Sequence, residues 1–174
     1  MKTIGLIGGM SWESSKLYYE LINQKVKAEL GGFHSCKSIL YTVDFDQIHH
    51  LQGVGDWATL DKIMVNAAQN LEKAGADIIL ICANTMHLCS EAITDNVEIP
   101  LLHIAEDTGQ AIVAKGLSKV ALLGTKYVME KDFYKDLLIN KFGIEVLIPT
   151  AEERDFIHEI IYGELVQGVL KDDS

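Results

Sequence analysis

The composition of the chain excludes several classes of protein before any motif is considered. Its 174 residues are 48% hydrophobic and 23% charged, which is typical of one globular domain or two small ones. The formal net charge of −10 argues against non-specific binding to nucleic acid or an anionic membrane, and no apolar stretch is long enough to span a bilayer. The three cysteines show no CxxC spacing and no signal peptide is recognised, so we expect a cytoplasmic protein without a disulfide framework.

The first elements follow a strand–helix order. Residues 3–7 are predicted to form a buried strand, and the glycines in the loop after it (residues 8–12) let backbone N–H groups turn toward a ligand. A helix is predicted from Ser11 to the glycine pair at residues 31–32, with an apolar face that points inward. The residues of that face are Leu17, Leu21, Ile22, Val26 and Leu30.

A pair of neighbouring histidines follows the second predicted strand, which covers residues 38–43. His49 and His50 lie in a short helical turn that also carries Gln52. Two histidines suggest a metal site, but adjacent helical positions point in different directions and no Cys/His spacing follows. We therefore predict a solvated loop here and no metal.

The remaining elements continue the alternation of helices and strands. An amphipathic helix is predicted over residues 56–73, before a central strand at residues 77–81. Its inward residues are Leu60, Ile63, Met64, Ala67, Ala68 and Leu71. In the second half we expect a short strand or crossing segment at residues 100–104, a helix at 106–115 with Ile112 and Val113 inward and a buried strand at 119–123. A helix at 131–142, a strand at 144–148, a helix at 152–162 and a helical tail are expected to follow.

This alternation predicts the fold class. Strands that alternate with helices throughout indicate an α/β fold with parallel, doubly wound sheets. Two similar βα units are expected, the first over residues 1–103 and the second, truncated and incomplete, over residues 104–174.

The central strand ends in small and polar residues at Ala83, Asn84 and Thr85. In an open parallel sheet, ligands bind outside the carboxyl ends of the strands, where these residues are expected. Asn84 and Thr85 are also good helix caps, so the motif by itself only weakly favours a small anionic ligand.

Five stretches of the sequence together resemble the aspartate/glutamate racemase family, and within it the broad-specificity amino-acid racemases. They run in one order along nearly the whole chain: IGLIGGMSWES at residues 4–14, VDF at 43–45, NTMH at 84–87, PLLHIA at 100–105 and ALLGT at 121–125. The resemblance implies racemisation of free aspartate, glutamate or related amino acids by a homodimer, with no pyridoxal phosphate, metal or other cofactor. Two groups, usually thiols, flank Cα, and one removes the α-proton while the other returns a proton on the opposite face.

The resemblance also implies which residues line the site. Asn84 and Thr85 are expected to hold the substrate α-carboxylate, and Thr125 to supply donors from the second unit. Met10 and Gln52 are expected to line the pocket. For Met10, ordinary packing between loop and helix is an equal alternative, and for Gln52 an exposed polar position is nearly equal.

Two departures from the family pattern bear on activity. The position of the first thiol is occupied by Ala83, which cannot transfer a proton, and Cys82 lies one residue earlier. Because neighbouring side chains of a strand point to opposite faces, Cys82 is expected to be a buried core residue. Cys89 would approach the pocket only after a rearrangement. The second departure is that the chain stops before the motif that bears the opposite thiol, which would leave sheet edges and apolar faces uncovered.

Three hypotheses follow for function. The chain is an active racemase, a binding protein that holds an amino acid without exchanging its α-proton, or a mainly structural product. His87, His103 and His158 are candidate replacement bases, although structural roles are favoured for all three. We expect a racemase-family protein with weak or absent activity, whose partner is a free amino acid as a small molecule and neither nucleic acid nor membrane.

Overall fold

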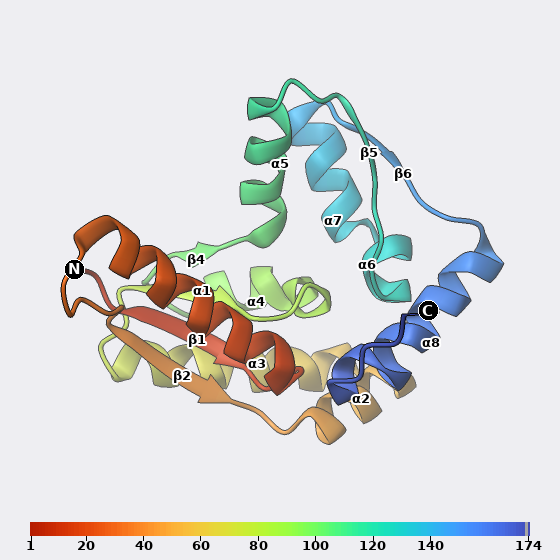
Figure 1. Ribbon diagram of the computed structural model, residues 1–174. Helices are drawn as coiled ribbons and strands as arrows, with labels where there is room; N and C mark the ends of the chain where they lie inside the picture. Colours follow the sequence, from red (N-terminus) through yellow and green to blue (C-terminus); the bar gives the residue numbers. More distant parts are fainter. Residues whose placement is uncertain (173) are drawn as a thin grey trace. The chain divides into compact units, whose positions relative to one another are not determined.

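The computed structural model describes residues 1–172 and 174 and divides into two compact units, Met1–Leu102 and His103–Ser174 (Figure 1). Each unit has its own parallel sheet and its own apolar core. The predicted α/β fold with parallel sheets is therefore confirmed. None of the helices in the described part of the chain combines the length and the apolar character that a membrane span requires.

Unit 1 is built on a four-stranded sheet with the order β2-β1-β3-β4 (Figure 1). Its strands are β1 (Ile4–Gly8), β2 (Ser38–Thr42), β3 (Ile78–Ile81) and β4 (Leu101–Leu102), and all pairings are parallel. The chain moves from β1 to β2 on one side and then crosses to β3 on the other. This reversal is the topological switch point of the sheet, where ligands bind in open α/β folds.

The helices of unit 1 are α1 (Trp12–Leu30), α2 (Phe45–Val54), α3 (Trp57–Lys73), the 3₁₀ turn η1 (Thr85–Cys89) and α4 (Ser90–Thr94). The amphipathic pattern of α3 is confirmed, because its inward positions are buried in the core, with Ile63 half-buried beside them. Asp56 caps α3 by accepting a hydrogen bond from the backbone N–H of Thr59 at 3.1 Å.

The predicted inward face of α1 is wrong in part. Leu17, Leu21 and Leu30 are about half exposed or more, at 50%, 60% and 54%. Ile22 and Val26 are half-buried, and the buried residue of this helix is Ser15. Helical spacing shows that apolar side chains share one face, but it does not show whether another element covers that face.

Unit 2 contains a two-stranded parallel sheet formed by β5 (Lys119–Ala121) and β6 (Glu145–Leu147). Its helices are α5 (Ile104–Ala114), α6 (Lys126–Glu130), α7 (Asp132–Asp136), the π-helical turn η2 (Leu137–Lys141), α8 (Ala151–Gly163) and the 3₁₀ turn η3 (Leu165–Gln167). The main apolar cluster described in this unit is small and consists of Ala105, Val128, Tyr134, Leu138 and Ile144, and Met129 is buried as well.

Several burial predictions for unit 2 are wrong. Of the strand expected to be buried over residues 119–123, Val120 and Leu122 are half-buried, whereas Leu123 is 64% exposed. Val113 is exposed, whereas Ile112 packs against the core. In the described part of the tail, no helix follows the short turn η3, whose C-cap is Gly168 with φ +71°. A two-stranded sheet has few neighbours, so an apolar strand pattern does not ensure burial here.

Candidate functional site

The candidate site lies where β1 and β3 end side by side in unit 1. Their parallel pairing runs from Ile4 opposite Ile78 to Ile7 opposite Ile81, and the backbone N–H of Cys82 extends it with a 2.9 Å bond to the Ile7 carbonyl. The loops that follow the two strands therefore start next to each other at the carboxyl edge of the sheet. These loops carry Met10 on one side and residues 83–85 on the other.

The glycine loop after β1 is shaped by packing. Gly9 has φ +95°, and a Cβ atom there would lie 2.3 Å from the Val43 carbonyl oxygen. Its N–H donates to Ser15 Oγ at 2.9 Å in a buried contact. The Gly9 N–H is therefore used inside the protein and does not turn toward a ligand, which corrects the expectation for this one glycine.

Ser14, in the first turn of α1, connects the two loops. Its Oγ lies 2.7 Å from the Cys82 carbonyl oxygen and 2.9 Å from the Ser11 carbonyl oxygen. A hydroxyl carries one proton, so it donates to one of these acceptors at a time. Our reading of the sequence missed Ser14 and Ser15, although hydroxyl residues in the first turn after a glycine loop are a usable signal for such backbone contacts.

Ala83, Asn84 and Thr85 form a corner of the chain, and the three residues differ in exposure. Ala83 is half-buried and packs against the core, Asn84 is exposed, and Thr85 is 6% exposed. Asn84 precedes η1 but makes no capping hydrogen bond with its side chain. Capping therefore does not account for this exposed residue, whose amide group can both donate and accept hydrogen bonds.

The buried ring of His87 forms hydrogen bonds with the backbone of this corner. Its ring is 1% exposed, and Nδ1 lies 2.9 Å from the Ala83 carbonyl oxygen and 3.2 Å from that of Asn84. Carbonyl oxygens only accept, so Nδ1 carries the proton in these contacts. The ring thus orients the two peptide groups that precede Thr85, which is a structural role.

Gln52 and Met10 are both buried in unit 1. Gln52, on α2, is 4% exposed and donates from Nε2 to Met86 Sδ at 3.2 Å, so the exposed alternative is wrong. Met10 is 7% exposed and belongs to the same core cluster as Met86. Met10 and Met86 therefore belong to one core cluster of unit 1, and Gln52 contacts Met86, while a pocket-lining role for Met10 and Gln52 stays a prediction.

The thiols of this unit are poorly suited to remove a proton. Cys82 is fully buried, as predicted, and burial raises its pKa to about 12. Burial also raises the pKa of Cys89, and the neighbouring Asp61 raises it further. Cys36 is half-buried, and burial raises its pKa as well. Neither Cys82 nor Cys89 is therefore expected to be a thiolate at neutral pH.

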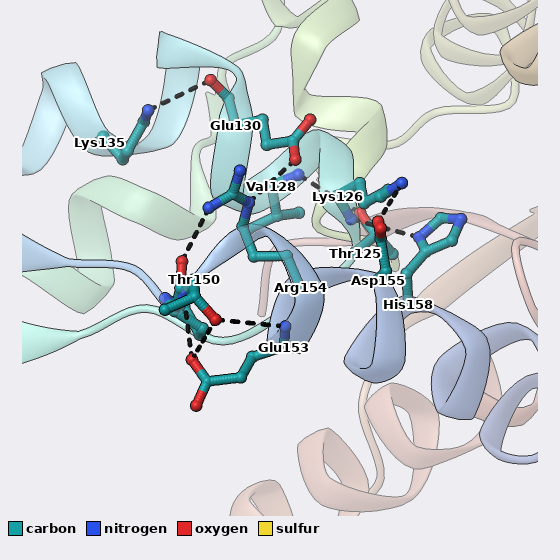
Figure 2. A network of polar contacts seen from close by, with 11 residues as sticks. Thr125, Lys126, Val128, Glu130, Lys135, Thr150, Glu153, Arg154, Asp155 and His158 are labelled. Carbon is teal, nitrogen blue, oxygen red and sulfur yellow. Dashed lines mark hydrogen bonds and ion pairs between the residues drawn. The ribbon is translucent and has the colours of Figure 1, made fainter.

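Thr125 lies in unit 2 and caps α6. Its Oγ1 accepts a hydrogen bond from the Val128 backbone N–H at 3.3 Å, within the network of polar contacts that Figure 2 shows.

The two other histidines named as candidate bases also make structural hydrogen bonds. His103 caps α5 through Nδ1, and burial lowers its pKa, while His158 accepts from the Lys126 backbone N–H.

No metal site is seen in the described residues, where no three His, Cys, Asp or Glu side chains are placed to hold an ion. His49 and His50 are exposed as expected and lie on α2, which agrees with the predicted helical turn and extends it to Phe45–Val54 in place of a loop. An open hollow of about 420 Å³ lies in unit 2 among apolar side chains that include Leu123, Leu147 and Phe156. None of the six predicted site residues lines this hollow.

Comparison with known proteins links the chain to racemases. The sequence model of the family described as Asp/Glu/Hydantoin racemase matches residues 7–173. The chain is 25% identical over 148 residues to the broad specificity amino-acid racemase RacX of Bacillus subtilis (strain 168). That match covers 78% of this chain and 60% of RacX, so the chain spans about three fifths of the length of this curated relative.

Solved structures show the same similarity. The crystal structure of a candidate Asp/Glu racemase from Yersinia pestis is 50% identical with a TM-score of 0.90, and the match covers 99% of this chain and 75% of that one. An aspartate racemase homologue from Pyrococcus horikoshii OT3 is 37% identical with a TM-score of 0.80, over the same shares of the two chains.

Proposed function

The chain belongs to the Asp/Glu/hydantoin racemase family, and from this premise we propose that it binds a free amino acid of the aspartate and glutamate class at the carboxyl edge of β1 and β3. In this proposal Asn84 and Thr85 hold the α-carboxylate, Met10 and Gln52 line the pocket, and Thr125 supplies donors from unit 2. Exchange of the α-proton is weak or absent in the chain as given.

The Asn84 side chain supports the binding half of the proposal. It is exposed, it makes no capping hydrogen bond, and its backbone is held by His87 and, through Cys82, by Ser14. A donor with a fixed backbone loses little entropy when it binds a ligand. The names of the relatives, an amino-acid racemase and an aspartate racemase homologue, agree with an amino acid as that ligand.

Ala83 is the observation that carries the proposal of weak proton transfer. A methyl group occupies the position where the family resemblance implies the first thiol. The neighbouring sulfur atoms do not replace it, because burial raises the pKa values of Cys82 and Cys89. A general base has to be within hydrogen-bond reach of the proton and deprotonated near the working pH, and these thiols fail the second requirement.

Family membership favours one alternative, an active cofactor-independent racemase that uses two-base proton transfer. This reading requires a base other than a residue 83 thiol. A homodimer is the family expectation for either function.

Proton exchange in D₂O distinguishes the two. The full chain is incubated with L- and D-aspartate and L- and D-glutamate, the Cα–H signal is followed by NMR, and binding is measured by titration calorimetry. We expect measurable binding with no loss of the Cα–H signal above the rate without protein. Rapid deuterium incorporation would overturn the proposal in favour of an active racemase. The absence of both binding and exchange would favour a structural role.

An Asn84→Ala variant tests the binding half by itself. It removes the exposed amide and no capping hydrogen bond, so the fold should be retained. We expect the Kd for the amino acid to rise by about tenfold, the loss of one hydrogen bond to a charged group. The matched control is Asn66→Ala on α3, which should leave the Kd unchanged.

A further inference from the structure

The short helix α6 begins at Thr125 and is tied to α8 by three polar contacts (Figure 2). The Lys126 backbone N–H donates to His158 Nδ1 at 3.2 Å, and the Lys126 ammonium pairs with Asp155. At the other end of α6, Arg154 Nε donates to Glu130 Oε1 at 2.9 Å. A five-residue helix is not stable by itself, so these contacts with α8 and the packing of Val128 in the core decide where it lies.

The bond to His158 satisfies one of the free donors at the start of α6. The first N–H groups of a helix have no acceptor within the helix. Here the Val128 N–H donates to Thr125 Oγ1, and the Lys126 N–H donates to His158 Nδ1. A backbone N–H only donates, so Nδ1 is unprotonated in this contact. The peptide bond between Thr125 and Lys126 is thereby fixed by a side chain 32 positions away.

The orientation of the His158 ring is itself fixed by two tyrosines. Its centroid lies 4.5 Å from that of Tyr162 in a tilted arrangement and 6.0 Å from that of Tyr127 in an edge-on one. The Tyr162 hydroxyl stays protonated because burial raises its pKa to about 12. The imidazole therefore presents Nδ1 to Lys126 in a defined direction.

We propose that His158 is a positioning residue for Thr125. It holds the Thr125–Lys126 peptide so that the Thr125 hydroxyl keeps a fixed orientation within unit 2. This inference rests on the proposed function, in which Thr125 supplies donors to the ligand. If His158 served packing alone, its ring would matter and its acceptor nitrogen would not.

Two substitutions separate the acceptor from the ring. His158→Phe keeps an aromatic ring between the tyrosines but removes the acceptor for the Lys126 N–H. His158→Asn removes the ring but places an amide oxygen near the position of Nδ1. Asp155→Ala is the matched control, because it removes the ion pair to the same Lys126 and leaves the backbone hydrogen bond in place.

The first measurement is amide hydrogen exchange at Lys126 and Val128 by NMR at pH 8. We expect exchange at Lys126 to be about tenfold faster in His158→Phe, while His158→Asn and Asp155→Ala stay within about threefold of the unchanged chain. Unchanged exchange in His158→Phe would overturn the inference, as would equal acceleration in the Phe and Asn variants.

The second measurement is the Kd for aspartate and glutamate. We expect a rise of about fivefold in His158→Phe and of less than about twofold in His158→Asn, even where the lost ring lowers its Tm. Faster Lys126 exchange in His158→Phe with an unchanged Kd would overturn the positioning role for Thr125. If the unchanged chain binds neither amino acid, the proposed function fails and the role toward the ligand fails with it. The exchange data then still decide whether His158 holds the peptide.

Discussion

Ala83 presents a methyl group at the carboxyl end of β3, next to the exposed Asn84 amide. We predict that Ala83→Cys increases deuterium incorporation at Cα of bound aspartate or glutamate by roughly tenfold or more, because a half-buried thiol ionises more easily than the buried Cys82. The measurement is NMR in D₂O. Cys82→Ala is the control and should leave the rate of deuterium incorporation unchanged. A rate in Ala83→Cys equal to that of the unsubstituted chain would contradict a role for position 83 in proton transfer.

Burial orders the reactivity of the three cysteines. At pH 8 a thiol with a pKa of about 12 is ionised in about one molecule in ten thousand, so Cys82 should resist iodoacetamide. We predict that Cys36 is alkylated first and that Cys82 and Cys89 react only after denaturation. Peptide mass spectrometry over time checks this order. Early labelling of Cys82 would show that the corner opens in solution.

Much of the candidate site could be predicted from residue patterns, because strand ends and family motifs place the 83–85 corner and the glycine loop. Other features depend on contacts across the fold. The burial of Gln52 comes from Met86, which is 34 positions away, and Ser14 bonds to a carbonyl 68 positions away. Local patterns do not encode such pairs, so the exposed alternative for Gln52 was hard to exclude from the sequence.

Among the elements, α3 depends on the Asp56 cap. Hydrogen bonds from the Thr59 hydroxyl and backbone N–H lower the pKa of Asp56. A lowered pKa in the folded state stabilises the fold above the ordinary pKa of aspartate, and this stabilisation is lost as the pH falls through the folded value. We predict that Asp56→Ala lowers the Tm by about 2–4 °C at pH 7 and that the difference is smaller at pH 3.

Circular dichroism melts at the two pH values test this prediction. Thr59→Val keeps the backbone donor and loses the hydroxyl donor at 2.7 Å, so its Tm should fall less than that of Asp56→Ala. A Tm difference for Asp56→Ala that stays constant between pH 7 and pH 3 would contradict an ionised cap.

Helices α3 and α1 show why the presence of an element is easier to predict than its burial. Helix α3 has a capping residue, a clear apolar face and a sheet to pack against, and its prediction is confirmed. Helix α1 has an equally regular apolar spacing, but Leu17 and Leu21 are exposed. Spacing reflects the geometry of the helix itself, whereas burial depends on a neighbour that the local sequence does not identify.

The two units of the molecule have apolar cores of unequal size. The main apolar cluster contains fourteen buried residues in unit 1 and five in unit 2. We predict that hydrogen exchange is faster for peptides from β5 and β6 than for peptides from β1 and β3, because fewer buried apolar contacts protect the smaller sheet. Hydrogen exchange with mass spectrometry measures the difference. Equal protection in both sheets would contradict it.

The pairing of β1 with β3 also has a kinetic consequence. The Thr3 N–H donates to the Asp77 carboxylate across a separation of 74 positions, at the start of the same pairing that brings the two loops of the site together. Closing so long a loop costs entropy before the pairing compensates for it, and such contacts form slowly. During refolding, the ability to bind an amino acid should therefore return only after this long-range pairing, later than the helical signal of the chain.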